Sequence, residues 1–177
     1  LRYGRVVEAA AALEKACALE PETGRLQALW AQALEQGGKI EAATAAYKRA
    51  IAHEPEVSEY YHNLGFLYAE MGEEAEAEAM FRKALMRNPH QVEAHFNLGG
   101  LYLDQRRYQR AADAYAAALE LQPNYADAWI NLASAQLHLG RNAEALAAYR
   151  RCLQLDLSTG IRARVEQQIA GLEASTD

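Results

Sequence analysis

The sequence has few prolines and cysteines, no long apolar run and no cluster of basic residues. Its longest apolar stretches fall far short of the roughly 20 residues that a membrane helix needs. Lys and Arg total 18 against 24 Asp and Glu, for a net charge of −6, which argues against a general nucleic-acid binder. We therefore expect a soluble protein whose partners include neither nucleic acid nor membrane, with the cytoplasm slightly favoured as its compartment.

Side chains that could carry chemistry are also sparse. The cysteines, Cys17 and Cys152, fall where a small buried hydrophobic residue is the simplest interpretation, and no disulfide between them is expected. No two histidines have the i, i+4 spacing of a helical zinc site. Neither a phosphate-binding glycine loop nor a nucleophile with a neighbouring base is evident. The sequence predicts no catalytic residue, cofactor or metal site, and so no enzyme.

The few prolines are evenly spaced. Each follows the previous one by 34 residues: Pro21, Pro55, Pro89 and Pro123. Small residues keep the same spacing, at Ala9, Ala43, Ala77, Ala111 and Ala145. Bulky residues follow four positions later, at Leu13, Tyr47, Phe81, Tyr115 and Tyr149. A period of this length indicates a repeat architecture.

The stretch from Val92 to Tyr125 shows one unit most clearly. Two segments of helical length, joined by a short polar turn, carry Leu98-Gly99, Tyr102, Ala111, Tyr115, Ala118 and Pro123. This pattern resembles the tetratricopeptide repeat family. The resemblance implies an all-α fold, a right-handed superhelical solenoid of antiparallel helix pairs in which each unit buries its apolar face on its neighbours.

The period predicts the domain organisation. Residues 1–23 hold the second helix of a truncated repeat, four repeats follow at 24–57, 58–91, 92–125 and 126–159, and 160–177 form a capping helix with a frayed tail at 175–177. Leu1 has the repeat position of Leu103, so we expect an excised fragment. The apolar face around Val6 and Leu13 would then be covered by upstream sequence or by another molecule. The capping helix carries one apolar stripe: Ile161, Val165, Ile169 and Leu172.

Glycines and glutamates add local predictions. The turns fall at Gly37-Gly38, Gly72, Arg106 and Gly140, and Arg106 should be strained or alter its turn, because such turns often need positive φ. Gly65 and Gly99 lie inside first helices, where glycine costs about 1 kcal/mol, and indicate a close helix crossing. The glutamates at 73, 74, 76 and 78 are interpreted as a solvated face, with Glu78 pairing with Arg82.

In the family that the chain resembles, the first helices line a concave groove. One groove position holds Asn63, Asn97 and Asn131, a row of amides that suits an extended peptide backbone. The row is similar to the asparagine ladder in the repeat arm of O-linked N-acetylglucosamine transferases and their plant relatives. Asparagine at this position could equally serve a local structural purpose, and both interpretations stay open.

Apolar and acidic side chains share the predicted groove. The apolar ones form a patch that favours a binding site: Phe66, Phe96, Leu103, Ile130 and Leu137. The acidic ones are Glu59, Glu93 and Asp127, and they favour a neutral or basic ligand. Some relatives hold a C-terminal carboxylate with Lys and Arg, but the corresponding positions here include Glu59, His62 and Phe96. That clamp is therefore not expected.

The groove residues favour one function: a protein–protein interaction scaffold that binds an extended or helical peptide segment of a partner in the groove. The first alternative is the substrate-recruiting arm of a larger enzyme, such as a glycosyltransferase. The second is a structural module that self-associates through the apolar face at Val6 and Leu13.

Overall fold

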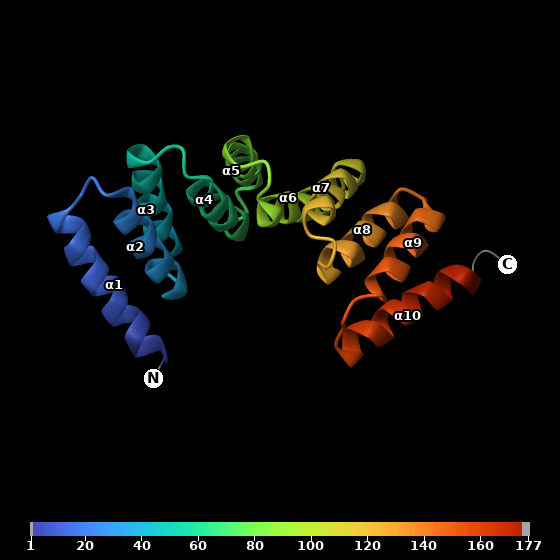
Figure 1. The fold of residues 1–177 in the computed structure, drawn as a ribbon. Helices are drawn as coiled ribbons and strands as arrows, with labels where there is room; N and C mark the ends of the chain where they lie inside the picture. Colours follow the sequence, from blue (N-terminus) through green and yellow to red (C-terminus); the bar gives the residue numbers. More distant parts are fainter. Residues whose placement is uncertain (1, 175–177) are drawn as a thin grey trace. The chain divides into compact units, whose positions relative to one another are not determined.

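The computed structural model describes residues 2–174, with side chains from Val6 onward, so Leu1 and the predicted frayed tail at 175–177 lie outside the described residues. Over this range the regular elements are all α-helices (Figure 1). In chain order they are α1 (Arg2–Leu19), α2 (Gly24–Gln36), α3 (Ile40–His53), α4 (Ser58–Glu70), α5 (Glu74–Arg87), α6 (Val92–Asp104), α7 (Tyr108–Leu121), α8 (Ala126–His138), α9 (Asn142–Cys152) and α10 (Thr159–Ala174).

Helix starts follow the predicted period. Helices α2, α4, α6 and α8 begin at the first residues of the four predicted repeats: Gly24, Ser58, Val92 and Ala126. Helix α1 begins at Arg2, ahead of the predicted start at Arg5. The predicted all-α solenoid of helix pairs is confirmed.

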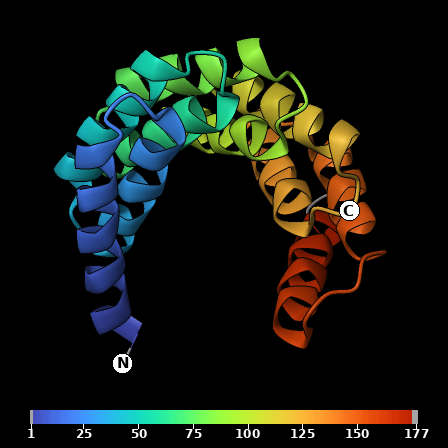
Figure 2. The ribbon, with the colours of Figure 1, turned by 60° about the vertical axis from the view of Figure 1, so that its left-hand side comes forward.

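The chain divides into two units, Leu1–Pro89 and His90–Asp177, which we describe separately. In the first unit α1 packs on α2, α2 on α3, α3 on α4 and α4 on α5. Figure 2 shows α1, α2 and α3 side by side, in shades of blue. In the second unit α6 packs on α7, α7 on α8, α8 on α9 and α9 on α10.

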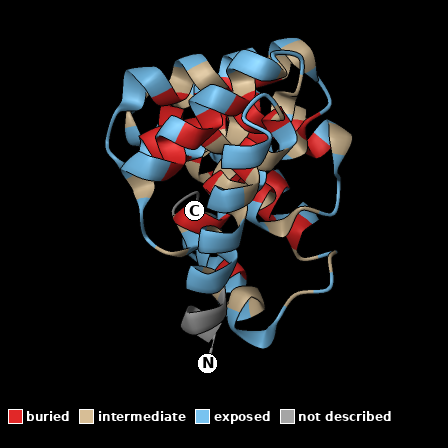
Figure 3. Ribbon diagram, turned by 90° about the vertical axis from the view of Figure 1, so that its left-hand side faces the viewer, coloured by how far each residue is buried: buried red, intermediate tan, exposed pale blue. Residues whose placement is uncertain are grey.

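The core of each unit includes a buried alanine and, four residues later, a buried ring on each of the second helices α3, α5, α7 and α9. Ala43, Ala77, Ala111 and Ala145 are fully buried, so neighbouring helices approach closely at these points. The rings four residues later are buried as well: Tyr47, Phe81, Tyr115 and Tyr149. Figure 3 shows the buried segments on the faces that the helices turn toward one another. Burying one such ring contributes about 1.5–3 kcal/mol.

Gly65 and Gly99 mark the predicted close crossings, which the structure confirms. A Cβ atom on Gly65 would lie 2.9 Å from Cδ1 of Phe81, and one on Gly99 would lie 2.8 Å from Cδ1 of Tyr115. Real Cβ atoms essentially never approach a neighbour that closely. Each glycine therefore makes room for the ring of the second helix in its own repeat.

The turn within each repeat has a residue in the left-handed region. Gly38, Gly72 and Gly140 have φ of 73°, 75° and 73°, and Arg106 has φ of 57°. The turn at Arg106 thus has the same left-handed conformation as the three glycine turns, and this conformation strains the arginine by about 1–2 kcal/mol. Of the two outcomes predicted for Arg106, the structure shows strain.

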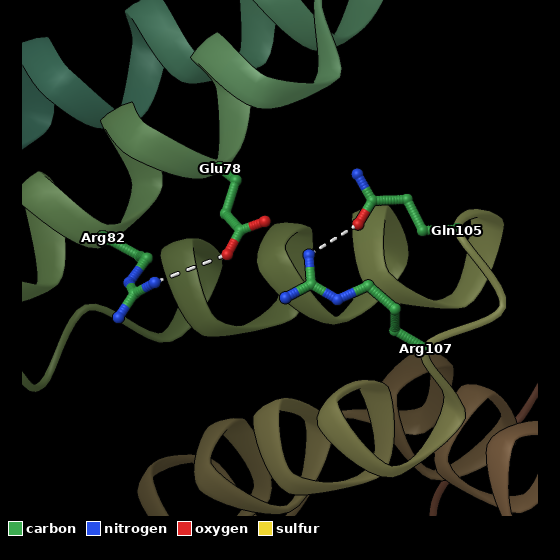
Figure 4. Close-up of polar contacts among 4 residues, drawn as sticks. All are labelled: Glu78, Arg82, Gln105 and Arg107. Atoms are coloured by element: carbon green, nitrogen blue, oxygen red, sulfur yellow. Dashed lines mark hydrogen bonds and ion pairs between the residues drawn. The ribbon is translucent and has the colours of Figure 1, made fainter.

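Figure 4 shows two polar contacts, one in each unit. In the first unit Glu78 Oε1 lies 3.5 Å from Arg82 Nη1, the predicted pair one turn apart, and Glu73, Glu74 and Glu76 are exposed. In the second unit Arg107 Nη1 donates to Gln105 Oε1 at 2.9 Å. The exposure of Glu73, Glu74 and Glu76 and the pairing of Glu78 with Arg82 are confirmed, whereas Glu78 itself is half-buried, with 17% of its side chain exposed.

The apolar stripe of α10 packs on the second unit. Val165 is 1% exposed, and Ile161, Ile169 and Leu172 pack half-buried around it against the cluster that holds Tyr149 and Cys152. Cys17 and Cys152 are both buried and free, and burial raises the pKa of each thiol. The prediction of buried, unlinked cysteines is confirmed.

A cavity of ≈ 370 Å³ lies between α1, α2 and α3, and its lining includes Val6, Ala10, Ala33, Leu34 and Gly37. In the next repeat the residue equivalent to Gly37 is Met71, whose sulfur lies 3.9 Å from Thr44 Oγ1. The first repeat therefore lacks a side chain that its neighbour has at this position.

Candidate functional site

The first helices of the first unit, α2 and α4, present apolar and polar side chains together. Leu29 on α2 is 40% exposed and Phe66 on α4 is 39% exposed, both high for large apolar residues in a packed helix. One turn before Phe66, Asn63 is half-buried, and its Oδ1 lies 3.1 Å from Nδ1 of the half-buried His62. Glu59, one turn before Asn63, is exposed.

Tyr47 of α3 lies beneath this face. Its side chain is 0% exposed, and its hydroxyl oxygen has no hydrogen-bond partner. Burial, and next the charge of Glu35, raise the pKa of Tyr47, whereas the side-chain amides of Asn63 and Gln32 lower it. The two amides therefore lie beside the hydroxyl without completing a hydrogen bond of ordinary geometry. A buried hydroxyl without a partner costs about 1–3 kcal/mol.

The surroundings of Tyr47 are acidic. Glu35, near the end of α2, is half-buried, and burial followed by the charge of Glu70 raises its pKa. Glu70 is the last residue of α4 and is exposed. Within the described part of the chain neither carboxylate forms a salt bridge. This end of the face is therefore negatively charged and not neutralised.

In the second unit Phe96 belongs to an aromatic cluster. Its ring stacks on Tyr125, with centroids 4.6 Å apart, and meets Tyr115 edge-on at 5.6 Å. Burial, then the charges of Asp127 and Glu93, raise the pKa of Tyr125, so both predicted acidic residues lie near this ring. Phe96 is consequently half-buried against the chain's own rings, and less of it is open to a ligand than of Phe66.

Asn131 repeats the relation of Asn63 to Tyr47. Burial, then the charge of Asp104, raises the pKa of Tyr115, and the side-chain amide of Asn131 lowers it. Each asparagine follows its tyrosine by 16 residues, so in both units the amide lies against a hydroxyl of the preceding repeat. This contact gives the asparagine the local structural purpose that the sequence left open, beside any purpose in binding.

The remaining predicted residues lie on α6 and α8. Ile130 and Leu137 are half-buried against the core cluster of α8, α9 and α10. Asn97 and Leu103 are half-buried on α6. The structure thus places Glu59, His62, Asn63 and Phe66 together on one helix of the first unit, and it places the others in the second unit.

Sequence reasoning missed three residues of the first unit: Gln32, Glu35 and Tyr47. Leu29 has the repeat position of the asparagine row, so the register of the repeats places it at the groove. Glu35 has the position at which Leu103 and Leu137 were predicted to line the groove, so the same rule applied to the first repeat finds it. Nothing in the sequence distinguishes Tyr47, because it has the same repeat position as the core rings Phe81, Tyr115 and Tyr149.

The described residues hold no group of three His, Cys, Asp or Glu side chains that could bind a metal ion. Among the same residues, no helix combines the length and the apolar character required to cross a membrane. The chemistry that the face offers consists of hydrogen bonding, apolar contact and negative charge.

Comparisons with known proteins agree with this architecture. A family model described as tetratricopeptide repeat matches residues 62–126 and 101–156, and a second, described as TPR repeat, matches 31–72. A search of curated proteins finds no match. Among solved structures, a crystal structure of MamA superimposes with a TM-score of 0.81 at 20% identity, covering 85% of this chain and 88% of that one.

Two further structures share the fold. The pilF protein of Pseudomonas aeruginosa has a TM-score of 0.81 at 19% identity over 99% of this chain and 82% of its own. A chain of the APC/C hetero-tetramer Cut9-Hcn1 has a TM-score of 0.73 at 20% identity, over 98% of this chain and 34% of its own. At these identities the likeness concerns the fold alone.

Proposed function

The chain belongs to the tetratricopeptide repeat family, and on that premise we propose that it is a protein–protein interaction scaffold. Its partner would contribute a peptide segment to the concave groove that the first helices are predicted to line. The observation that carries the proposal is the exposure of Leu29 and Phe66 beside the polar groups of His62 and Asn63. Apolar side chains of this size, left open next to hydrogen-bonding groups, are typical of a binding surface.

Apolar contacts and amide hydrogen bonds would contribute different free energies of binding on this face. Burying Phe66 and Leu29 under a ligand contributes about 1.5–3 kcal/mol each, whereas one amide hydrogen bond contributes about 0.5–1.5 kcal/mol net. The amides alone would give millimolar binding or weaker, and the apolar contacts bring it toward micromolar. The apolar residues set the affinity, and the amides set the register of the peptide.

The second unit offers a related face on α6 and α8. Asn97 and Asn131 supply amides, and the half-buried Phe96, Leu103, Ile130 and Leu137 supply apolar surface. Glu93 and Asp127 lie near the Tyr125 ring and make this face acidic. Both units therefore favour neutral or basic segments over acidic ones.

The proposal is tested by selecting short random peptides on the immobilised protein and measuring their affinity for variants by calorimetry. Phe66→Ala should weaken binding by about tenfold or more, because about 1.5 kcal/mol of apolar burial is lost. The matched control is Met86→Ala, which removes an apolar side chain that is 76% exposed on a second helix of the same unit. Equal affinities of the Phe66→Ala and Met86→Ala variants would refute the proposed surface.

The asparagines are tested with the same peptides. Asn63→Ala and Asn131→Ala should each weaken binding several-fold if their amides contact the peptide. Both should also lower the thermal midpoint, because each amide lies against a buried tyrosine hydroxyl. Lower stability with unchanged affinity would assign the asparagines to the fold alone.

A further inference from the structure

Small residues create the cavity between α1, α2 and α3. Its lining includes Ala33 and Gly37, and the next repeat has the larger Leu67 and Met71 at these positions. Met71 extends toward α3, since its sulfur lies 3.9 Å from Thr44 Oγ1. The corresponding place in the next repeat is thus occupied by the chain's own methionine, so a methionine side chain is the kind of group that the cavity can accept.

The cavity is open to solvent, and most of its lining side chains are apolar. Val7, one of them, is 50% exposed, whereas Leu34 is buried in the wall. A Cβ atom on Gly37 would lie 3.9 Å from Cγ1 of Val6, so a side chain at this position would extend toward α1. The volume of ≈ 370 Å³ lies near the lower end of the range of about 300–1,000 Å³ that is typical of ligand pockets. An apolar group from outside the chain can therefore enter.

Met86, on α5 of the same unit, is an exposed side chain of the matching kind. It is 76% exposed, so it makes little contact with its own chain. The equivalent residues of the other repeats are small or polar: Ala52, Glu120 and Gln154. Methionine is flexible and polarizable, and it fills irregular apolar gaps well. Met86 thus offers at the surface of the unit what Met71 supplies between two repeats.

The charges beside the two features favour their contact. Lys83 lies one turn before Met86 and is exposed. At the cavity the exposed Glu14 is among the lining residues, together with one base, Lys39. Exposed ion pairs contribute little to affinity, so the attraction between Lys83 and Glu14 would orient the approach, and burial of the methionine would provide the affinity.

We propose that the cavity is a docking site for a second copy of this chain, whose Met86 side chain enters it. The inference goes beyond the proposed function, because Leu29 and Phe66 are not among the described lining residues. Each copy has both the methionine and the cavity, so the contact is head-to-tail. One contact leaves a methionine free on one copy and a cavity free on the other, and further copies can add until the ends meet.

The test measures self-association of the whole chain by sedimentation equilibrium from about 10 μM to 1 mM. The unmodified protein should form species larger than a monomer as its concentration rises. Met86→Ala should weaken this association by about tenfold or more, because most of the inserted side chain is lost. Leu19→Ala is the matched control, because Leu19 is 83% exposed on α1 and is not among the described lining residues. It should associate like the unmodified protein.

Gly37→Met blocks the cavity from within and should weaken the association by about tenfold or more as well. Gly37 has a φ of −84°, which any residue adopts, and methionine is the residue of the next repeat at this position. The variant should therefore fold, and circular dichroism and the thermal midpoint check this. Loss of association with an unchanged or raised thermal midpoint separates a blocked cavity from unfolding.

The two variants complement each other. Met86→Ala retains the cavity and Gly37→Met retains the methionine, so each alone should be a monomer over most of the concentration range. In an equimolar mixture, Met86 of the Gly37→Met chain can enter the cavity of the Met86→Ala chain. The mixture should then form a dimer of one copy of each variant, which cannot add further copies because no free methionine and open cavity remain.

Four results would overturn the inference. The unmodified protein could stay monomeric up to about 1 mM, where even weak contacts are detected. Met86→Ala could associate like Leu19→Ala, or association could persist in Gly37→Met, which would each assign it to another surface. The mixture could stay monomeric although the unmodified protein associates. Peptide binding is tested separately, because Phe66→Ala should leave self-association unchanged and Met86→Ala should leave peptide affinity unchanged.

Discussion

Gly99 and Gly100 are adjacent on α6, and the structure predicts different effects on stability when each is changed to alanine. A Cβ atom at position 99 would lie 2.8 Å from both Cδ1 and Cε1 of the Tyr115 ring. At position 100 the nearest neighbour would be the Tyr115 hydroxyl at 3.6 Å, an ordinary contact. The pair therefore separates the effect of one steric contact from the general effect of replacing a glycine in a helix.

The magnitude follows from two contributions. Alanine is favoured over glycine inside a helix by about 1 kcal/mol, and this gain applies to both positions. Only Gly99→Ala also pushes against the buried Tyr115 ring, and overpacking of a core costs about 1–3 kcal/mol. Gly100→Ala should thus stabilise the protein by up to about 1 kcal/mol, and Gly99→Ala should be less stable than Gly100→Ala by about 1–3 kcal/mol.

Urea unfolding followed by circular dichroism measures both variants against the unmodified protein. The free-energy difference corresponds to a separation of about 2–4 °C in thermal midpoint for each kcal/mol in a chain of this size. Gly99→Ala should also change the near-ultraviolet signal of the tyrosines, because the Tyr115 ring must move. Equal stability of the two variants would refute the close crossing of α6 and α7 as the reason for glycine at position 99.

Three further predictions follow from the backbone and from burial. Gly37→Met fills the cavity beside α1 and should raise the free energy of unfolding by about 0.5–2 kcal/mol. Gly38→Met should lower it, because Gly38 has a φ of 73°. Urea unfolding of both variants measures the difference. Arg106→Gly should raise the free energy of unfolding by about 1 kcal/mol in the same assay, because arginine adopts the φ of 57° at this turn at a cost. An unchanged free energy of unfolding would contradict the strain at Arg106. Burial, then the hydrogen bond to Glu54, raises the pKa of Tyr60 from 10.0 to about 12. The unfolded chain therefore loses this proton first, so stability that is full below pH 10 should fall as pH rises toward 12. Tyr60→Phe should make that fall less steep in unfolding measured across this range, and an unchanged slope would count against the assignment.

The helix pairs could be predicted from the sequence because each repeat packs on its neighbours with one fixed pattern. The prolines, the buried alanines and the ring four residues after each alanine recur at one spacing, so helix starts such as Ser58 and Val92 follow from counting. The strain at Arg106 follows from the same register, since its equivalents are all glycines.

The site was less predictable, because position in a repeat does not determine exposure. Phe96 and Phe66 both lie at predicted groove positions, yet Tyr125, which follows Pro123 after the second helix, stacks on Phe96 and covers part of it. Tyr47 looks like any core ring in the pattern, and only the three-dimensional arrangement shows that its hydroxyl lacks a partner. Side-chain contacts between neighbouring repeats decide these features, and one sequence does not reveal them.

The contact of Asn63 with Tyr47, repeated by Asn131 with Tyr115, ties the outward surface of one hairpin to the interior of the hairpin before it. A buried substitution such as Tyr115→Phe should therefore change how the Asn131 amide is presented at the surface, although the substitution itself lies in the interior. A helical hairpin that is grafted into another repeat array should be moved together with the hairpin that precedes it. The asparagine lies on the grafted hairpin, but the tyrosine that its amide lies against belongs to the preceding one.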